Sequence, residues 1–460
     1  MGGARASGVV GALCATAAAV VAAFALSAGR TATAATDSAG AVHEGVASCA
    51  GSSCHSRQVD SGVNVRQNEL ITWQDPSSLA GAHSRAYKVL YEGRGQAIIR
   101  KMGLGDSGVA SQCLGCHADP APASLRGARF QINDGVGCEA CHGGSRNWLA
   151  SHRAVEGTHA NNVARGMRAL ENPKVRAGVC LDCHFGGSRQ GQFVTHEIMA
   201  AGHPRVAFEL DLFSSLQQHW DVDADYVKRK GHAGGVKTWA VGQAMALERA
   251  LTLYGEPGRN KGAFPELYFF DCHSCHRQIS DDPKARPQWQ ANPGRPIPSG
   301  TPPFNDENMI MLSAAAKVVA PALAVRLETD SRAFHTALAR DRAESIRAAA
   351  KLAGTARALS DAFAARSFTR SETLAIVDTI LQGEIARRYT DYTGSAQAVM
   401  AADTLLNALV ASGQADRGAV ARIRPNLDRA YAQVRDPNAY RPEAFRASLT
   451  QVAQAARSLR

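Results

Sequence analysis

Hydrophobic residues recur at helical spacing through the last third of the chain. Between positions 372 and 387, one helical face is formed by Leu374, Val377, Leu381 and Ile385. Thr369 precedes this run with Glu372 three residues later, which is a capping-box pattern. Similar patterns occupy residues 307–327, 331–352, 395–409 and 442–459, with a kink expected at Pro321. These patterns predict an antiparallel helical bundle over residues 305–460.

The region before this bundle shows shorter apolar stretches. Residues 86–102 and 239–254 have helical patterns, and Gly255 is a candidate C-cap of the second. Strand signals are sparse, and six prolines between positions 287 and 303 indicate a linker. We therefore predict a mainly α fold, with a domain of helices and loops over residues 45–300 followed by the bundle.

The N-terminus has the layout of a secretory signal peptide over residues 1–34. An apolar run at residues 8–29 follows Arg5 and precedes Ala32-Thr33-Ala34, a small-residue cleavage site. A retained membrane anchor is the alternative, but the many Ala and Gly residues make the run a weak hydrophobic span. Cleavage predicts a periplasmic protein and removes Cys14.

Composition directs attention to a cofactor. The 460 residues include 11 Cys and 15 His, while aromatic residues make up only 6%. A disulfide scaffold is not expected, because such scaffolds serve short chains that cannot build a core. The ten cysteines outside the leader all lie between Cys49 and Cys275, where an oxidising compartment would pair unprotected thiols.

Four Cys-x-x-Cys pairs are each followed at once by His. The four motifs are Cys113–Cys116–His117, Cys138–Cys141–His142, Cys180–Cys183–His184 and Cys272–Cys275–His276. In this motif two thiols add to the haem vinyl groups, and the adjacent His becomes the proximal ligand of the iron. Two tetrahedral zinc sites are the alternative, which the invariable trailing His and the leader disfavour. Disulfide exchange normally uses a single such motif in a thioredoxin-like context.

A fifth candidate has four residues between its thiols, in Cys49-Ala50-Gly51-Ser52-Ser53-Cys54-His55. The Gly and Ser residues allow the extra length to loop out while both thiols reach one porphyrin. A disulfide with an incidental His is the alternative. Haem attachment at this motif gives each of the ten cysteines outside the leader a haem to bind. The chain is therefore expected to carry five covalently attached haem c groups.

Five haems also account for the charge of the chain. The sequence has 51 Lys plus Arg and 41 Asp plus Glu, a net charge of +10. Two propionates on each of five haems would balance this excess, so the basic character does not call for a nucleic-acid partner.

Ten histidines remain as candidates for the second axial ligand that closes an electron-transfer haem. The five preferred candidates are His83, His152, His159, His196 and His203. His196 and His203 are seven residues apart and share a helical face if the helix continues that far. Surface or propionate-bonding roles are the alternatives. Weaker candidates are His43, His219, His232 and His273, together with the thioethers of Met102, Met167 and Met199.

Several strings resemble those of multihaem cytochromes c related to the tetrahaem electron acceptor of hydroxylamine oxidoreductase, the cytochrome c-554-like family. They are the Cys49–Cys54–His55 motif, Gln67-Asn68-Glu69 with Trp73, His83-Ser84-Arg85-Ala86-Tyr87, the string from Gly135 to Gly143, and Ala201-Gly202-His203-Pro204. The resemblance spans residues 45–280 and implies closely stacked, mostly bis-His haems. It also implies that His152 ligates a neighbouring haem. A fifth motif departs from the tetrahaem pattern, and no Cys-x-x-Cys-Lys of pentahaem nitrite reductases occurs.

The leading interpretation is a periplasmic electron carrier that passes electrons along its haems to and from redox proteins or a membrane complex. In this interpretation the bundle docks a partner or a second subunit. The alternative is an oxidoreductase acting on a small nitrogen or sulfur compound at a five-coordinate haem. A third interpretation makes the haem region a structural wire in a larger membrane-associated complex. The sequence leaves enzymatic activity open.

Overall fold

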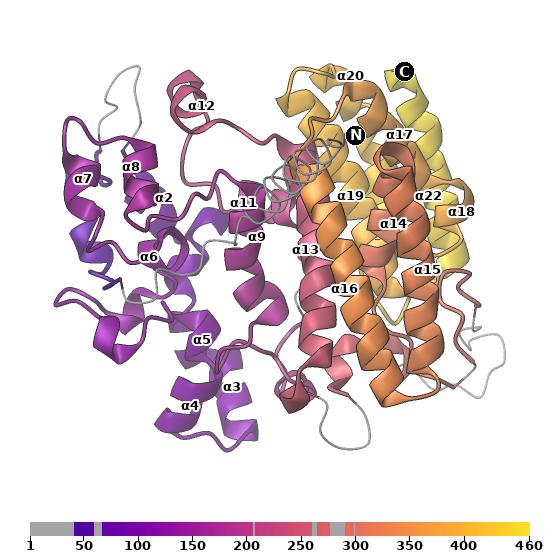
Figure 1. Ribbon diagram of the computed structural model, residues 1–460, viewed down its shortest axis with the longest axis horizontal. Helices are drawn as coiled ribbons and strands as arrows, with labels where there is room; N and C mark the ends of the chain where they lie inside the picture. Colours follow the sequence, from indigo (N-terminus) through magenta and orange to yellow (C-terminus); the bar gives the residue numbers. More distant parts are fainter. Residues whose placement is uncertain (1–40, 59–66, 206–207, 260–264, 277–289, 299) are drawn as a thin grey trace, which may run out of the picture. The chain divides into compact units, whose positions relative to one another are not determined.

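The long helix α13 (Gly235–Gly255) contacts helices from both parts of the chain. Its buried side chains include Trp239, Leu247 and Leu251, each at most 1% exposed. It packs most extensively on α16 (Arg342–Ala364), and also on α9 (Pro173–Leu181). A helix that is apolar around most of its circumference is stable only when neighbours cover it, so α13 becomes a central element (Figure 1).

The computed structural model describes residues 41–58, 67–205, 208–259, 265–276, 290–298 and 300–460. Residues Ala41–Arg460 form one compact unit. Their secondary structure is helical, and within the described residues extended pairing is limited to the isolated bridges His43–Arg126 and Phe270–Phe304. The predicted mainly α fold is confirmed.

The C-terminal region forms a series of helices, most of which lie where its apolar pattern predicts them. They are α14 (Glu307–Val319), α15 (Pro321–Leu338), α16, α17 (Arg370–Leu381), α18 (Gly383–Ala386), α19 (Tyr392–Ala411), α20 (Arg417–Ala421), α21 (Arg424–Gln433) and α22 (Pro442–Ala456). The capping box is present at the start of α17, where Thr369 and Glu372 bond to each other's backbone N–H groups. The sequence pattern did not indicate α20 and α21.

Three expected helices are divided in the structure. Pro321 does not kink a continuous helix, but begins α15 at its first position, where the missing N–H costs nothing. The expected helix 331–352 is interrupted before Arg342, because Asp341 caps α16 through the Glu344 N–H. The expected helix 372–387 breaks at Gly383, which adopts φ +70°.

The first part of the chain consists of short helices joined by loops. They are α2 (Glu69–Gln74), α3 (Gly93–Lys101), α4 (Asp106–Gln112), α5 (Leu114–His117), α6 (Cys138–His142), α7 (Leu149–Arg153), α8 (His159–Ala164), α9, α10 (His196–Ala200), α11 (Leu210–Leu216) and α12 (Ala224–Lys230). The expected helix 86–102 is divided at Glu92, whose backbone is extended between the 3-10 turn Lys88–Tyr91 and α3.

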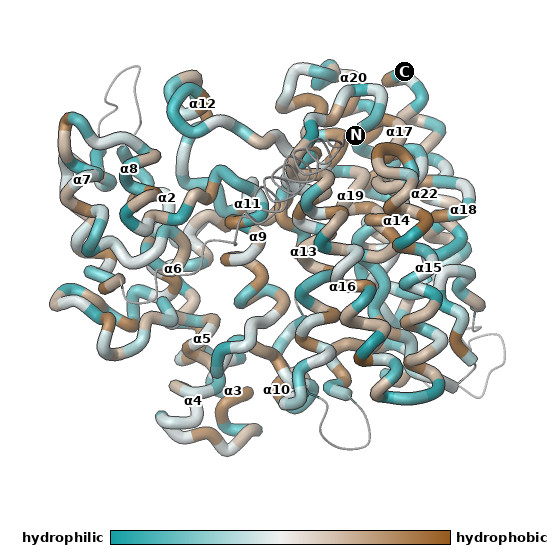
Figure 2. The backbone as a smooth tube through the Cα atoms, viewed as in Figure 1, coloured by the Kyte–Doolittle hydropathy of each residue, from teal (hydrophilic) through white to brown (hydrophobic). Residues whose placement is uncertain are grey.

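Buried hydrophobic side chains are distributed very unevenly between these two parts. One cluster runs from Phe193 through α13 and the bundle to Leu459, and a smaller one joins α9, α11 and α13. No described residue between positions 41 and 176 belongs to either cluster. Figure 2 shows hydrophobic and hydrophilic stretches that alternate along the bundle helices. The described residues between positions 41 and 176 therefore lack a hydrophobic cluster of their own.

The division into domains at 45–300 and 305–460 stays a prediction, and α13 from the first range contributes to the core of the second. The signal peptide expected at residues 1–34 lies outside the described residues. Within the described part, no helix combines the length and apolar character needed to cross a membrane.

Truncation of Leu405 in α19 should destabilise the bundle. Its side chain is 0% exposed in the large cluster, so Leu405→Ala should lower the free energy of unfolding by about 2–5 kcal/mol. Val325→Ala is the control, because Val325 is 70% exposed and should have little effect. Denaturant unfolding followed by circular dichroism measures both, and equal effects would contradict the assigned packing.

Candidate functional site

Short helical turns organise the cysteine motifs. We number the motifs I to V in chain order. Motif I is Cys49–Cys54–His55, II is Cys113–Cys116–His117, III is Cys138–Cys141–His142, IV is Cys180–Cys183–His184, and V is Cys272–Cys275–His276. In motif II the His117 N–H donates to the Cys113 carbonyl at 3.1 Å, and in motif V the His276 N–H donates to the Cys272 carbonyl at 2.7 Å. One turn of helix thus gathers two thiols and one imidazole.

Motif I contains a turn that begins at Gly51. The Gly51 carbonyl accepts from the Cys54 N–H at 2.8 Å and from the Ser56 N–H at 3.3 Å. All ten described cysteines are free thiols, and each is half-buried except the exposed Cys275. No disulfide joins Cys49 to Cys54 in the described structure.

Four of the five motif histidines face a second histidine from a distant segment. The ring centroids are 6.0 Å apart for His55 and His152, 6.2 Å for His117 and His203, 6.2 Å for His184 and His83, and 5.8 Å for His276 and His196. Four of the five preferred candidates from the sequence therefore lie opposite a motif histidine, each opposite a different one.

The spacing of these pairs fits a metal ion held between the two rings. An imidazole nitrogen binds a transition metal at about 2.0 Å, and the ring centroid lies about 1.1 Å further, so two rings on opposite sides of one metal have centroids about 6 Å apart. Rings in direct contact would pack more closely. The missing side-chain core between residues 41 and 176 also leaves room for large apolar groups.

Burial keeps these imidazoles in the neutral form that metal ligation requires. It lowers the pKa of His142 to about 3 and the pKa of His184 to about 4. Burial also lowers the pKa values of His83, His117 and His203. At neutral pH these five rings therefore retain a lone pair for a ligand.

Two glycines place the facing histidines. Gly135, at φ +74°, packs so close to His83 that a Cβ would lie 2.7 Å from the His83 carbonyl, and the next N–H, from Val136, donates to that carbonyl at 3.0 Å. Helix α10 ends at Ala200, and Gly202 turns the chain at φ +119°. His196 and His203 do not share a continuous helix, and they face motifs V and II respectively.

His159 is the preferred candidate that faces no motif histidine in the described structure. Its Nε2 lies 2.9 Å from the Glu171 carboxylate, which is a sufficient partner for a half-buried imidazole.

Three weaker candidates from the sequence have other neighbours. His43 pairs with Asp119 through Nδ1 at 2.8 Å, and these two lie beside Glu139. His273 lies against the ring of Tyr392 at 5.2 Å. Met199 packs against the large hydrophobic cluster.

His219, a weaker candidate from the sequence, lies near the fifth motif histidine. Among charged neighbours, His219 has the largest effect in lowering the pKa of His142, after burial. Its Nδ1 lies 3.1 Å from the Gln217 carbonyl, which holds the ring with Nε2 available to a ligand. Sequence spacing did not favour His219 because it follows no motif closely and sits in a short loop between α11 and α12.

Cysteine neighbours show which motifs lie side by side. Cys49 and Cys138 lie close enough for each thiol to shift the pKa of the other, which links motifs I and III. Cys183 Sγ lies 3.7 Å from the Gly115 carbonyl and Cys116 Sγ lies 4.0 Å from the Cys183 carbonyl, which links motifs II and IV. Cys141 and Cys180 interact electrostatically, which places motif III beside motif IV. The segment from His196 to His203 joins motif V to motif II. The spatial order is therefore I, III, IV, II, V.

Glu139 anchors motif III to the start of the described chain. Its buried carboxylate accepts the backbone N–H groups of Glu44, Gly45 and Ser145 at 2.7–2.8 Å. Three donors satisfy the carboxylate, so the cluster of His43, Asp119 and Glu139 is explained as a structural junction.

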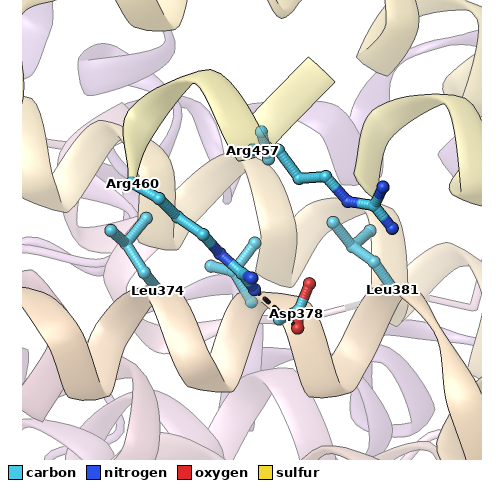
Figure 3. A pocket seen from close by; sticks show the side chains of 7 residues that line it. Leu374, Asp378, Leu381, Arg457 and Arg460 are labelled. Carbon is cyan, nitrogen blue, oxygen red and sulfur yellow. Dashed lines mark ion pairs between the residues drawn. The ribbon is translucent and has the colours of Figure 1, made fainter. Parts of the chain in front are cut away.

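A surface pocket of the bundle contains none of this chemistry. Figure 3 shows its lining from α17 and the C-terminal end, where Arg460 pairs with Asp378 at 2.7 Å. Its lining has no histidine or cysteine. The histidine pairs are therefore the candidate functional site.

Glu139→Gln should weaken the junction at motif III. The amide offers one oxygen in place of two and turns an N–H₂ group toward backbone donors, so the free energy of unfolding should fall by about 1.5–3 kcal/mol. Glu44→Gln is a control on the same segment, because its side chain pairs with the exposed Arg146 and should matter little. Thermal unfolding of the complete protein compares the two, and a neutral Glu139→Gln would refute the anchoring role.

Comparison with known proteins supports the sequence resemblance. Residues 48–143 match the profile of the family described as cytochrome c554 and c-prime. The matched segment contains motifs I, II and III, and the match indicates a c-type cytochrome with haem c and a role in electron transfer. No curated protein and no solved structure matches the chain.

Proposed function

We propose that this chain, whose residues 48–143 are a cytochrome c554-like segment, is an exported electron carrier with five covalently attached haems. Each haem accepts and releases a single electron at its iron when bound. The chain supplies thiols for attachment, two imidazoles for each iron, and the spacing between neighbouring sites.

The four facing histidine pairs carry this proposal. Each pair joins one motif histidine to one histidine outside the motifs, and the two partners are 80 to 101 residues apart in all four pairs. Side chains this distant in sequence do not acquire the same separation by local geometry. Bis-His ligation of one iron by each pair explains the common spacing.

His219 is the proposed second ligand of motif III. It lies near His142, and its Nδ1 partner leaves Nε2 directed to a ligand, as second-shell hydrogen bonds to metal-bound histidines commonly do. Closure of all five irons favours electron transfer over chemistry on a bound substrate. The oxidoreductase alternative requires that the iron of motif III remain open.

The neighbouring motifs supply an electron path. Contacts between motifs order the sites I, III, IV, II, V, so electrons can pass through all five without a long gap. The motifs at the two ends include exposed positions, such as Cys275 in motif V. We propose that redox proteins or a membrane complex exchange electrons there, and that the bundle supports docking or self-association.

Mass spectrometry tests haem attachment. Protein made in a host able to attach haem c should be heavier than its polypeptide by five haem groups, and Cys49→Ser with Cys54→Ser should remove one of them. Cys14→Ser is the control, since a cleaved leader residue should not alter the mature mass. A wild-type mass with four haems would remove motif I from the assignment, and zinc in place of haem would refute the proposal.

His203→Ala should open one iron. The loss of this ring opposite His117 should produce a high-spin ferric signal and binding of carbon monoxide to one ferrous haem. His159→Ala is the matched control, because His159 pairs with Glu171 and should leave the spectra unchanged. Wild-type protein should bind no carbon monoxide. Binding by the wild type would favour the oxidoreductase alternative instead.

A further inference from the structure

A carboxylate contacts the axial histidine of motif I. His55 Nδ1 lies 3.0 Å from Glu69 Oε2, and the two side chains are 35% and 20% exposed. Glu69 begins α2, and the adjacent Leu70 N–H donates to the His55 carbonyl at 2.9 Å. Two contacts thus fix α2 on motif I, and the hydrogen bond to Glu69 raises the pKa of His55 against the effect of burial.

The two facing histidines of motif II have neutral partners at the same atom. His117 Nδ1 lies 2.7 Å from the Ala86 carbonyl, and His203 Nδ1 lies 2.8 Å from the Pro204 carbonyl. A carbonyl fixes the orientation of a ring without adding a formal charge. The Glu69 carboxylate does both, so motif I differs from motif II in charge while retaining the same hydrogen-bond geometry.

The chemical consequence concerns the electron density of the imidazole. A carboxylate that accepts the Nδ1–H draws the proton toward itself and gives the ring partial imidazolate character, which makes its Nε2 a stronger donor. A stronger donor and a nearby negative charge both stabilise the ferric over the ferrous state. The reduction potential of the site is lowered.

We propose that Glu69 is a positioning and tuning residue that makes motif I more reducing than motif II. This inference rests on the proposed function, because it takes His55 to be an axial ligand. Motif I lies at one end of the order I, III, IV, II, V. An electron that enters at motif I would therefore have a driving force toward motif II, further along this order.

Glu69→Gln tests the proposal in the complete, haem-loaded protein. The amide keeps an oxygen acceptor for His55 and removes the charge. Spectroelectrochemical titration should show one component shifted to more positive potential, and the low-spin electron paramagnetic resonance signal of that haem should change its largest g value. The component missing from the Cys49→Ser, Cys54→Ser protein identifies motif I.

Glu171→Gln is the matched control. Glu171 also forms a carboxylate pair with a histidine, but that histidine is His159, which faces no motif histidine in the described structure. The same change in charge should leave the motif I component in place. Glu69→Asp provides a second variant if Glu69→Gln impairs folding. Asp retains the charge on a shorter side chain, so the potential of motif I should shift less in the Glu69→Asp protein than in the Glu69→Gln protein.

The outcomes separate this inference from the proposed function. An unmoved motif I potential in Glu69→Gln protein with all haems attached and low-spin would overturn the role of Glu69 and leave the electron-carrier proposal intact. Equal shifts in Glu69→Gln and Glu171→Gln proteins would also overturn it, because they would reflect distant charge alone. Missing haems in the wild type would instead contradict the proposed function.

Discussion

The first part of the chain depends on histidine rings that face one another about 6 Å apart. One such pair joins the segments around His55 and His152, and neither segment contributes to a hydrophobic cluster. A conventional domain obtains its cohesion from buried side chains. In the proposed function, covalent haems held by paired imidazoles would supply this cohesion instead.

The bundle, in contrast, obtains its cohesion from a continuous apolar core that its helices bury. Helix α13 connects the region of the cysteine motifs to the bundle. It packs on α16 within the large cluster and on α9, which leads directly into motif IV. Motif V is also close to the bundle, since His273 lies against Tyr392 at the start of α19. A stable bundle thus offers a rigid support for the end of the proposed electron path, while motif I lies at the other end beside Glu69.

Much of this arrangement could be predicted from sequence because its signals are local. The capping box at Thr369 and the helical turns of the Cys-x-x-Cys-His motifs are set by neighbouring residues. The family match at residues 48–143 agrees with the resemblance inferred from the motifs. Helix ends at Pro321, Asp341 and Gly383 were misplaced because apolar periodicity continues across them. The positions of His159 and His219 could not be read from spacing, since both depend on what the folded chain places opposite them: Glu171 for the first, and the surroundings of His142 for the second.

Anomalous X-ray diffraction at the iron absorption edge tests the central claim most directly. Crystals of the haem-loaded protein should show five iron peaks, with one between the rings of each of the four facing histidine pairs and the fifth at His142. Irons located away from these pairs, or an anomalous signal at the zinc edge alone, would contradict the account.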